Sequence, residues 1–198
     1  NVYLATSGSL TVENVAASNQ ARARIVTAGS TDVELYKFQM TALTEDVDVT
    51  RFIISDAILS TSLGATHVSG KSTSTFYNFE LWDGGTRIAG PTSITSSSSP
   101  TVGGYIDFTL QASTPYRVDS GAQKVITLKA DATAWPNMSS GSTHTFSLQT
   151  NPLGDAGSTR AITARGAGSS TAVNGPTSVA TGSKITVRRA YPLVERFS

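Results

Sequence analysis

Residues 29–56 read GSTDVELYKFQMTALTEDVDVTRFIISD, and this stretch predicts the fold class of the whole chain. Side chains alternate from residue 33 to residue 42, so that one face is apolar from Tyr36 to Ala42. A period of two with one apolar face is the pattern of a β-strand that buries one side. The stretch therefore predicts a half-buried strand followed by a second strand.

The second strand is expected to begin at Val47, and its alternation changes to a continuous apolar run at Phe52-Ile53-Ile54. That change predicts a β-bulge or burial on both faces. Further along, Phe76–Trp82 and Arg87–Ala89 flank Asp83-Gly84-Gly85, which has the chemistry of a tight hairpin turn. We expect these two segments to pair as a β-hairpin.

Similar patterns recur to the end of the chain and are separated by Gly, Ser, Pro and Asn. Only Asn14–Arg24 has helical character, and its Asn and Ser content disfavours a stable helix. The spacing predicts an all-β protein, an immunoglobulin-like or jelly-roll-like β-sandwich of about ten strands with little or no helix. The remaining strands are expected at residues 105–110, 125–130, 143–150, 160–165 and 184–189.

We expect one sandwich at residues 18–183, and two small domains are the alternative. Residues 1–17 form an N-terminal strand and a candidate donor strand, and residues 184–198 form a C-terminal strand that is a candidate segment between subunits or domains. The low-complexity stretch at 93–101 reads as an exposed loop, and residues 166–183 read as an extended strand or a linker. Neither divides the chain into self-sufficient halves.

The composition limits the classes of function. Of 198 residues, 38% are hydrophobic and 15% charged, while Ser and Thr supply roughly a quarter. A formal net charge of +1 argues against disorder and against binding of nucleic acid or an anionic membrane. No apolar run approaches the ~18 residues of a membrane-spanning helix. The chain contains no cysteine, and it starts at Asn1 rather than Met, which predicts removal of a preceding segment.

Side chains suited to catalysis are few. The two histidines, His67 and His144, lie in Ser- and Thr-rich settings, where we expect them to be exposed at strand ends. No nucleophile-elbow pattern occurs. Most carboxylates, Asp56 among them, are expected at strand ends, where turns favour Asp. The sequence therefore predicts no catalytic residue and a protein that is not an enzyme.

Two other kinds of site have candidates. The densest acidic cluster is Glu45, Asp46 and Asp48, which are the candidate calcium ligands because Ca²⁺ prefers clustered carboxylate oxygens. No other cofactor is expected. Asn137 begins the triplet Asn137-Met138-Ser139, an acceptor sequence for N-glycosylation, and glycans are therefore candidate partners.

Both ends of the chain are apolar and strand-like, whereas chain ends are usually polar and frayed. Each end either pairs with its own sandwich or completes a sheet in the next subunit as a donor strand. In the second case donor and acceptor surfaces differ, and the contact generates an open filament. The candidate interface residues are Val2, Tyr3, Leu4, Leu10, Val12, Tyr191, Leu193, Val194 and Phe197.

Three segments resemble a repeat-type β-sandwich domain of bacterial and archaeal cell-surface proteins. The first is residues 29–56, with Gly29-Ser30-Thr31, Lys37-Phe38, Thr41-Ala42 and Glu45-Asp46-Val47; the others are Asn78–Gly84 and Val187–Pro192. The resemblance covers about half of the chain, which holds one copy of the unit. It implies a surface-layer or pilus-like sandwich without catalytic residues.

The leading hypothesis is a structural subunit of an extracellular filament, pilus or surface layer that forms a homopolymer by strand pairing or strand donation. The alternative is a carbohydrate-binding or adhesion module of a larger surface protein, in which Tyr77, Trp82, Tyr105 and Trp135 form an aromatic platform. A viral coat protein is a third hypothesis. An exposed row of aromatic rings would favour the binding module.

Overall fold

A computed structural model describes residues 8–16, 19–60, 75–96, 104–134, 141–153 and 159–189. These residues contain thirteen strands and no helix, so the predicted all-β class is confirmed. The strands outnumber the expected ten because short ones such as β2, β7 and β9 escaped the sequence pattern. The bounds are β1 Ser9–Asn14, β2 Arg24–Thr27, β3 Val33–Leu43, β4 Val47–Ser60, β5 Phe76–Asp83, β6 Thr86–Thr92, β7 Ile94–Ser96, β8 Gly104–Thr109, β9 Tyr116–Val118, β10 Gln123–Ala132, β11 Ser142–Leu148, β12 Ile162–Gly166 and β13 Ala180–Arg188.

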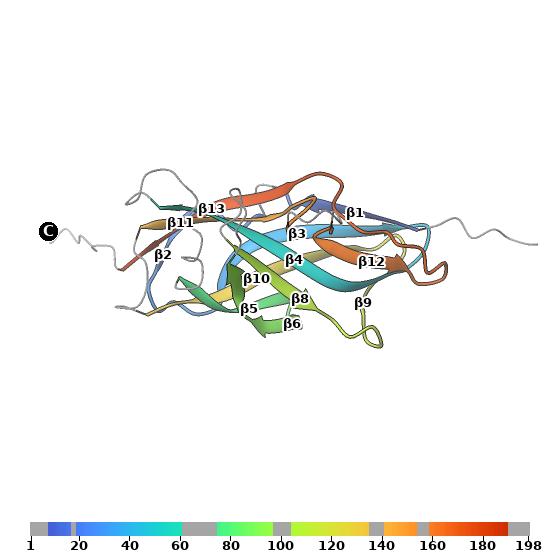
Figure 1. The fold of residues 1–198 in the computed structure, drawn as a ribbon, viewed down its shortest axis with the longest axis horizontal. Helices are drawn as coiled ribbons and strands as arrows, with labels where there is room; N and C mark the ends of the chain where they lie inside the picture. The colour runs from blue at the N-terminus through green and yellow to red at the C-terminus, as the bar shows by residue number, and fades with distance from the viewer. Residues whose placement is uncertain are drawn as a thin grey trace, which may run out of the picture.

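The strands form two sheets that pack into a sandwich (Figure 1). One sheet has the order β1-β3-β10-β5-β6, and the other has the order β2-β13-β11-β4-β8-β7 with β12 and β9 also paired to β4. The 14-residue β4 is long enough to pair with β12 and then β11 on one side, and with β9 and then β8 on the other. The strand order matches that of an immunoglobulin-like sandwich, with β1-β3-β10-β5 in one sheet and β13-β11-β4 in the other. Of the two predicted sandwich types, the structure therefore agrees with the immunoglobulin-like one and not with the jelly roll.

The core lies between the sheets and follows the predicted alternation. In β3, Tyr36, Phe38 and Met40 are fully buried. In β4 the pairing register with β12 shifts opposite Thr50, and Ile53 on the outward phase is also fully buried. Both the bulge and the two-sided burial predicted for this strand are therefore present.

The predicted hairpin is also present. Strands β5 and β6 pair antiparallel, and Asp83 faces Thr86 across the turn. Gly84 has a φ of 56°, a left-handed value that glycine adopts without steric cost.

The chain crosses between the sheets after β1. Strand β1 lies antiparallel to β3 in one sheet, whereas β2 lies parallel to β13 in the other. The described residues between Asn14 and Arg24 form this crossing and contain no helix. The segment with the strongest helical character in the sequence is therefore a link between two sheet edges.

The C-terminal strand belongs to the sandwich. The predicted boundary between residues 183 and 184 falls inside β13, which lies between β2 and β11. Ile185 and Val187 are fully buried there. Residues 184–188 therefore complete a sheet of their own chain. Within the described parts of the chain, no helix is long and apolar enough to cross a membrane.

Candidate functional site

The chain enters and leaves the sandwich at opposite ends of its long axis. Strand β1, which follows Gly8 in the sequence, begins at one end, and strand β13, which precedes Arg189, finishes at the other end (Figure 1). Two predicted interface residues, Leu10 and Val12, lie in β1 and pair with Ala42 and Met40 of their own chain. The other predicted interface residues fall outside the described residues, and their role stays a prediction. They are Val2, Tyr3, Leu4, Tyr191, Leu193, Val194 and Phe197.

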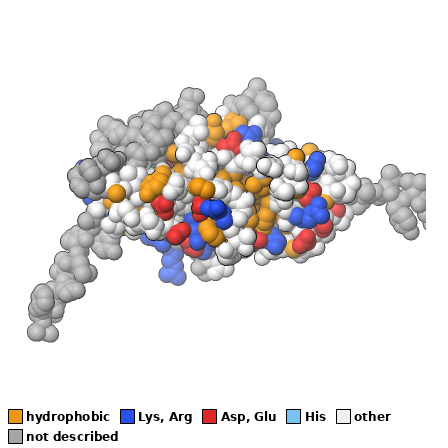
Figure 2. All heavy atoms as spheres, turned by 90° about the horizontal axis from the view of Figure 1, so that it is seen from below, with side chains coloured by type: hydrophobic (Ala, Val, Ile, Leu, Met, Phe, Trp, Pro, Cys, Tyr) orange, Lys and Arg blue, Asp and Glu red, His pale blue; other side chains and the backbone are white. Residues whose placement is uncertain are grey.

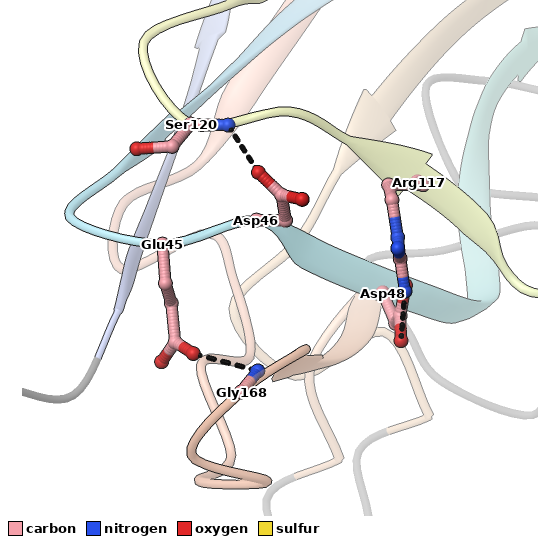
Figure 3. Close-up of polar contacts among 6 residues, drawn as sticks. All are labelled: Glu45, Asp46, Asp48, Arg117, Ser120 and Gly168. Carbon is pink, nitrogen blue, oxygen red and sulfur yellow. Dashed lines mark hydrogen bonds and ion pairs between the residues drawn. The ribbon is translucent and has the colours of Figure 1, made fainter. Parts of the chain in front are cut away.

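Glu45 fixes the point at which the chain enters the fold. Its carboxylate accepts a hydrogen bond from the backbone N–H of Gly168 at 2.9 Å (Figure 3). It also accepts hydrogen bonds from the backbone N–H groups of Gly8 at 2.7 Å and Ser169 at 2.9 Å. The Ser169 hydroxyl donates a fourth bond at 2.5 Å. The hydrogen bond from the Ser169 hydroxyl has the largest effect on the pKa of Glu45, and together the four bonds lower this pKa from 4.5 to about 2. The carboxylate therefore ties the start of β1 to the loop after β12.

The three candidate calcium ligands lie close in sequence, but each has its own partner (Figure 3). Asp46 accepts a hydrogen bond from the backbone N–H of Ser120 at 2.9 Å, and Asp48 forms a two-bond ion pair with Arg117 at 2.9 and 3.2 Å. Among the described residues, no three His, Cys, Asp or Glu side chains cluster as metal ligands do. The acidic cluster thus ties loops and strands together, and Asn137, the glycosylation candidate, lies outside the described residues.

Half of one edge of β3 has no strand beside it. Strand β1 pairs with β3 only as far as Phe38, so residues 33–37 have β10 on one side and no strand among the described residues on the other. Side chains occupy the ladder positions there. The Gln20 amide donates to the carbonyl oxygen of Lys37 at 2.5 Å and accepts from its N–H at 3.2 Å. The Arg24 guanidinium donates to the carbonyl oxygen of Glu34 at 2.8 Å.

Two surface hollows border this edge. One, of about 310 Å³, is lined by residues 24–27 and 30–33. The other, of about 540 Å³, lies over β3 and β10 beside Gln20 and Val125. The side chain of Ile25, in the neighbouring β2, is 53% exposed. The edge is thus covered by a thin layer of side chains with open space on both sides.

The structure contradicts the predicted exposure of His144 and the predicted turn position of Asp56. Both are buried, in β11 and β4, because they lie on the inward phase of strands that also carry Phe146 and Ile54. His144 Nδ1 lies 2.7 Å from Asp56 Oδ2, and His144 Nε2 lies 3.0 Å from Ser142 Oγ. His67 lies outside the described residues.

This Ser142–His144–Asp56 row has the order of contacts found in serine hydrolases. A hydrolase also needs a cleft that admits the substrate and donors for an oxyanion. The side chain of Ser142 belongs to a residue that is only 4% exposed, and rings of Phe76 and Phe146 pack around His144. Five surface hollows of the described part lie elsewhere and contain none of the three side chains.

The aromatic residues suggested for sugar binding are divided between the sheets. Tyr77 and Trp82 lie in β5 of one sheet, and Tyr105 lies in β8 of the other. The Lys129 ammonium lies 4.6 Å from the centre of the Trp82 ring. Trp135 lies outside the described residues. The described aromatic rings therefore form no shared platform.

Charged groups on the surface are mixed in sign. On the face in Figure 2, Lys and Arg side chains lie next to Asp and Glu side chains, with apolar groups scattered between them. Ion pairs between such side chains include Arg87 with Glu80 at 2.7 Å and Arg51 with Asp107 at 2.6 Å. Such a face carries no broad field of one sign.

No protein-family model matches the chain, and no curated protein matches it. Among solved structures, the chain is similar to the CssB subunit, complemented with a donor strand from the CssA subunit, of enterotoxigenic Escherichia coli colonization factor CS6. The two are 10% identical over 90% of this chain and 97% of that one, with a TM-score of 0.33. A score this low carries no argument about fold or function.

Proposed function

We propose that this protein is a structural subunit of an extracellular assembly, a filament, pilus or surface layer, whose subunits join by β-strand pairing. The observation that carries the proposal is that β1, the first strand, begins at one end of the long axis and β13, the last strand, finishes at the opposite end (Figure 1). In the proposed assembly, subunits stack head to tail, and each contributes a different surface to the contact. A contact between unlike surfaces repeats without closing and builds an open polymer.

The sheet edges support the same proposal. Exposed strand edges invite uncontrolled pairing, and natural sandwiches shorten or interrupt them. Here β7 has three residues and β2 has four, while β6 pairs with β5 through two register shifts. In an assembly that uses strand pairing, most sheet edges have to be short or irregular, so that subunits pair at one specific edge.

The same proposal holds that the protein has no enzymatic activity and needs no cofactor. The Ser142–His144–Asp56 row then serves as a core hydrogen-bond network that gives both ring nitrogens of His144 a buried partner, whereas Asp56 Oδ1 has none among the described residues. Incubation with a fluorophosphonate, followed by intact-mass measurement, tests this reading. We expect the unmodified mass, and a stoichiometric adduct that disappears in Ser142→Ala would show an active nucleophile instead.

The assembly itself is tested by light scattering of the purified chain over a hundredfold range of concentration. We expect the mean mass to rise with concentration to multiples of 20.6 kDa. A mass of one subunit at every concentration would exclude a self-assembling subunit. In that case the carbohydrate-binding or adhesion module becomes the leading function, and a glycan array is the experiment that examines it.

A further inference from the structure

We propose that the open edge of β3, residues 33–37, is the strand-acceptor site of the assembly, and that its occupant is the segment Asn1–Ser7 of a second copy. This inference rests on the proposed function and assigns the surfaces that meet. We call residues 33–37 the acceptor edge. Residues Gln20 and Arg24, whose side chains occupy it, are called the cover.

The cover performs the hydrogen bonding of a missing strand. Gln20 gives one hydrogen bond to the Lys37 carbonyl and takes one from the Lys37 N–H, which is the pair of bonds that a residue of an adjacent strand makes. Arg24 satisfies the Glu34 carbonyl in the same way. Backbone groups that stay unpaired are costly, so an edge held open for a strand needs such a substitute.

The cover is also suited to leave. Gln20 is half-buried and Arg24 is exposed. Among the described residues of the crossing segment, the buried side chains are small and apolar, those of Val15 and Ala21. Replacing two side chains by a strand exchanges hydrogen bonds for hydrogen bonds and adds apolar contact with Ile25, which is 53% exposed. Strand addition is therefore favoured by the contacts that it adds.

The segment Asn1–Ser7, reading NVYLATS, fits the acceptor edge by its chemistry. It has no charged side chain and no proline, and its β-branched and aromatic side chains favour strand pairing. The competing segment at residues 190–198 contains Pro192, Glu195 and Arg196. Proline cannot donate to a ladder, and charged residues discourage pairing of an edge.

Geometry places the donor in another copy. Ser9 pairs with Leu43, so the acceptor edge begins six residues, or about 20 Å, along β3 and ends at about 34 Å. Seven extended residues span about 23 Å, and β1 already fills the intervening edge. The segment cannot cover the acceptor edge of its own chain. From a second copy stacked end to end, it enters antiparallel to β3 and in line with β1.

The experiment uses the full chain, a Leu4→Asp variant that places a charge in the donor, and a Leu193→Asp control at the other end. Hydrogen exchange is followed by mass spectrometry, with and without a synthetic peptide of residues 1–7. We expect Leu4→Asp to abolish assembly and Leu193→Asp to preserve it. The peptide should slow exchange at residues 33–37 of the Leu4→Asp chain at least about tenfold, and the same peptide carrying Leu4→Asp should not.

A second variant tests the cover. Gln20→Ala removes hydrogen bonds that compete with the donor, and we expect it to tighten peptide binding about fivefold, the effect of one ordinary hydrogen bond. Asn19→Ala, at the neighbouring exposed position, is the matched control and should leave binding unchanged. Weaker or unchanged binding by Gln20→Ala would overturn the role of the cover.

The outcomes separate the two proposals. If the chain assembles but the peptide protects another strand, or Leu193→Asp alone prevents assembly, the acceptor edge is wrong while the structural function stands. If the chain does not assemble and yet the peptide protects residues 33–37, these residues do bind the donor segment, but the proposed self-assembling subunit is wrong. If neither occurs, both are wrong.

Discussion

Removal of the second half of β13 should unfold the protein, whereas removal of the residues beyond it should not. A chain ending at Ser183 loses Ile185 and Val187, both fully buried, and deprives β2 of its one strand neighbour among the described residues. Val26 of β2 then loses its cover as well. Each such side chain contributes about 1.5–3 kcal/mol, so the three together contribute about 5–9 kcal/mol.

That loss is comparable with the whole stability of a domain, which is about 5–15 kcal/mol. We expect the chain ending at Ser183 to lack a cooperative thermal transition by circular dichroism. A chain ending at Arg189 keeps every described strand and should melt within a few degrees of the full protein. A folded chain ending at Ser183, with dispersed amide signals in NMR, would refute the placement of β13 inside its own sheet.

Three further predictions concern single residues. Glu45→Gln should lower the free energy of unfolding most at neutral pH. Because folding lowers the pKa of Glu45 from 4.5 to about 2, the wild-type carboxylate stabilises the fold above about pH 4.5 and loses this contribution as the pH falls toward 2. Urea unfolding of both proteins across this range should give curves that converge in acid, and a constant difference would contradict the prediction. Gly90→Ala should destabilise the fold by about 1–3 kcal/mol or more, since Gly90 has a φ of 95° and a Cβ there would lie 2.4 Å from the Phe79 carbonyl oxygen. Gly85→Ala is the control, because a Cβ at Gly85 meets nothing within 4 Å. Equal melting temperatures for the two variants would contradict the prediction. Asp56→Ala should lower the free energy of unfolding by about 1–3 kcal/mol, because it leaves the buried His144 Nδ1 without its partner. An unchanged free energy in chemical denaturation would contradict a stabilising contact between Asp56 and His144.

The sequence predicted the features that depend on local patterns. The alternation from Tyr36 to Ala42 gave the central strand, and Asp83-Gly84-Gly85 gave the hairpin, because a period of two and a glycine turn are readable within a few residues. The irregular pattern after Val47 gave the bulge in β4. These elements fix the fold class.

Contacts between distant residues were missed. His144 and Asp56 are 88 positions apart, and Gln20 and Lys37 are 17 apart, so no spacing rule joins them. One signal was available for His144, because it shares the inward phase of β11 with Phe146 and Leu148. For β13 the alternation predicted a strand but not its partner, since the same pattern suits a strand in its own sheet or in the sheet of a neighbouring subunit.

The polar clusters show why composition is a weak guide to sites. Glu45, Asp46 and Asp48 form the densest acidic group in the sequence, yet their carboxylates accept hydrogen bonds from Gly168, Ser120 and Arg117 (Figure 3). These three partners lie in separate segments of the chain. An acidic side chain near a turn is as well suited to binding backbone N–H groups as to binding a cation. The partners become visible only with the tertiary structure.

Electron microscopy of the purified protein at high concentration tests the central claim most directly. Because β1 begins at one end of the sandwich and β13 finishes at the opposite end, we predict rows of subunits with their long axes along the row and one subunit in each repeat (Figure 1). Single particles at every concentration, or stacks in which the sandwiches lie side by side across the row, would contradict head-to-tail assembly.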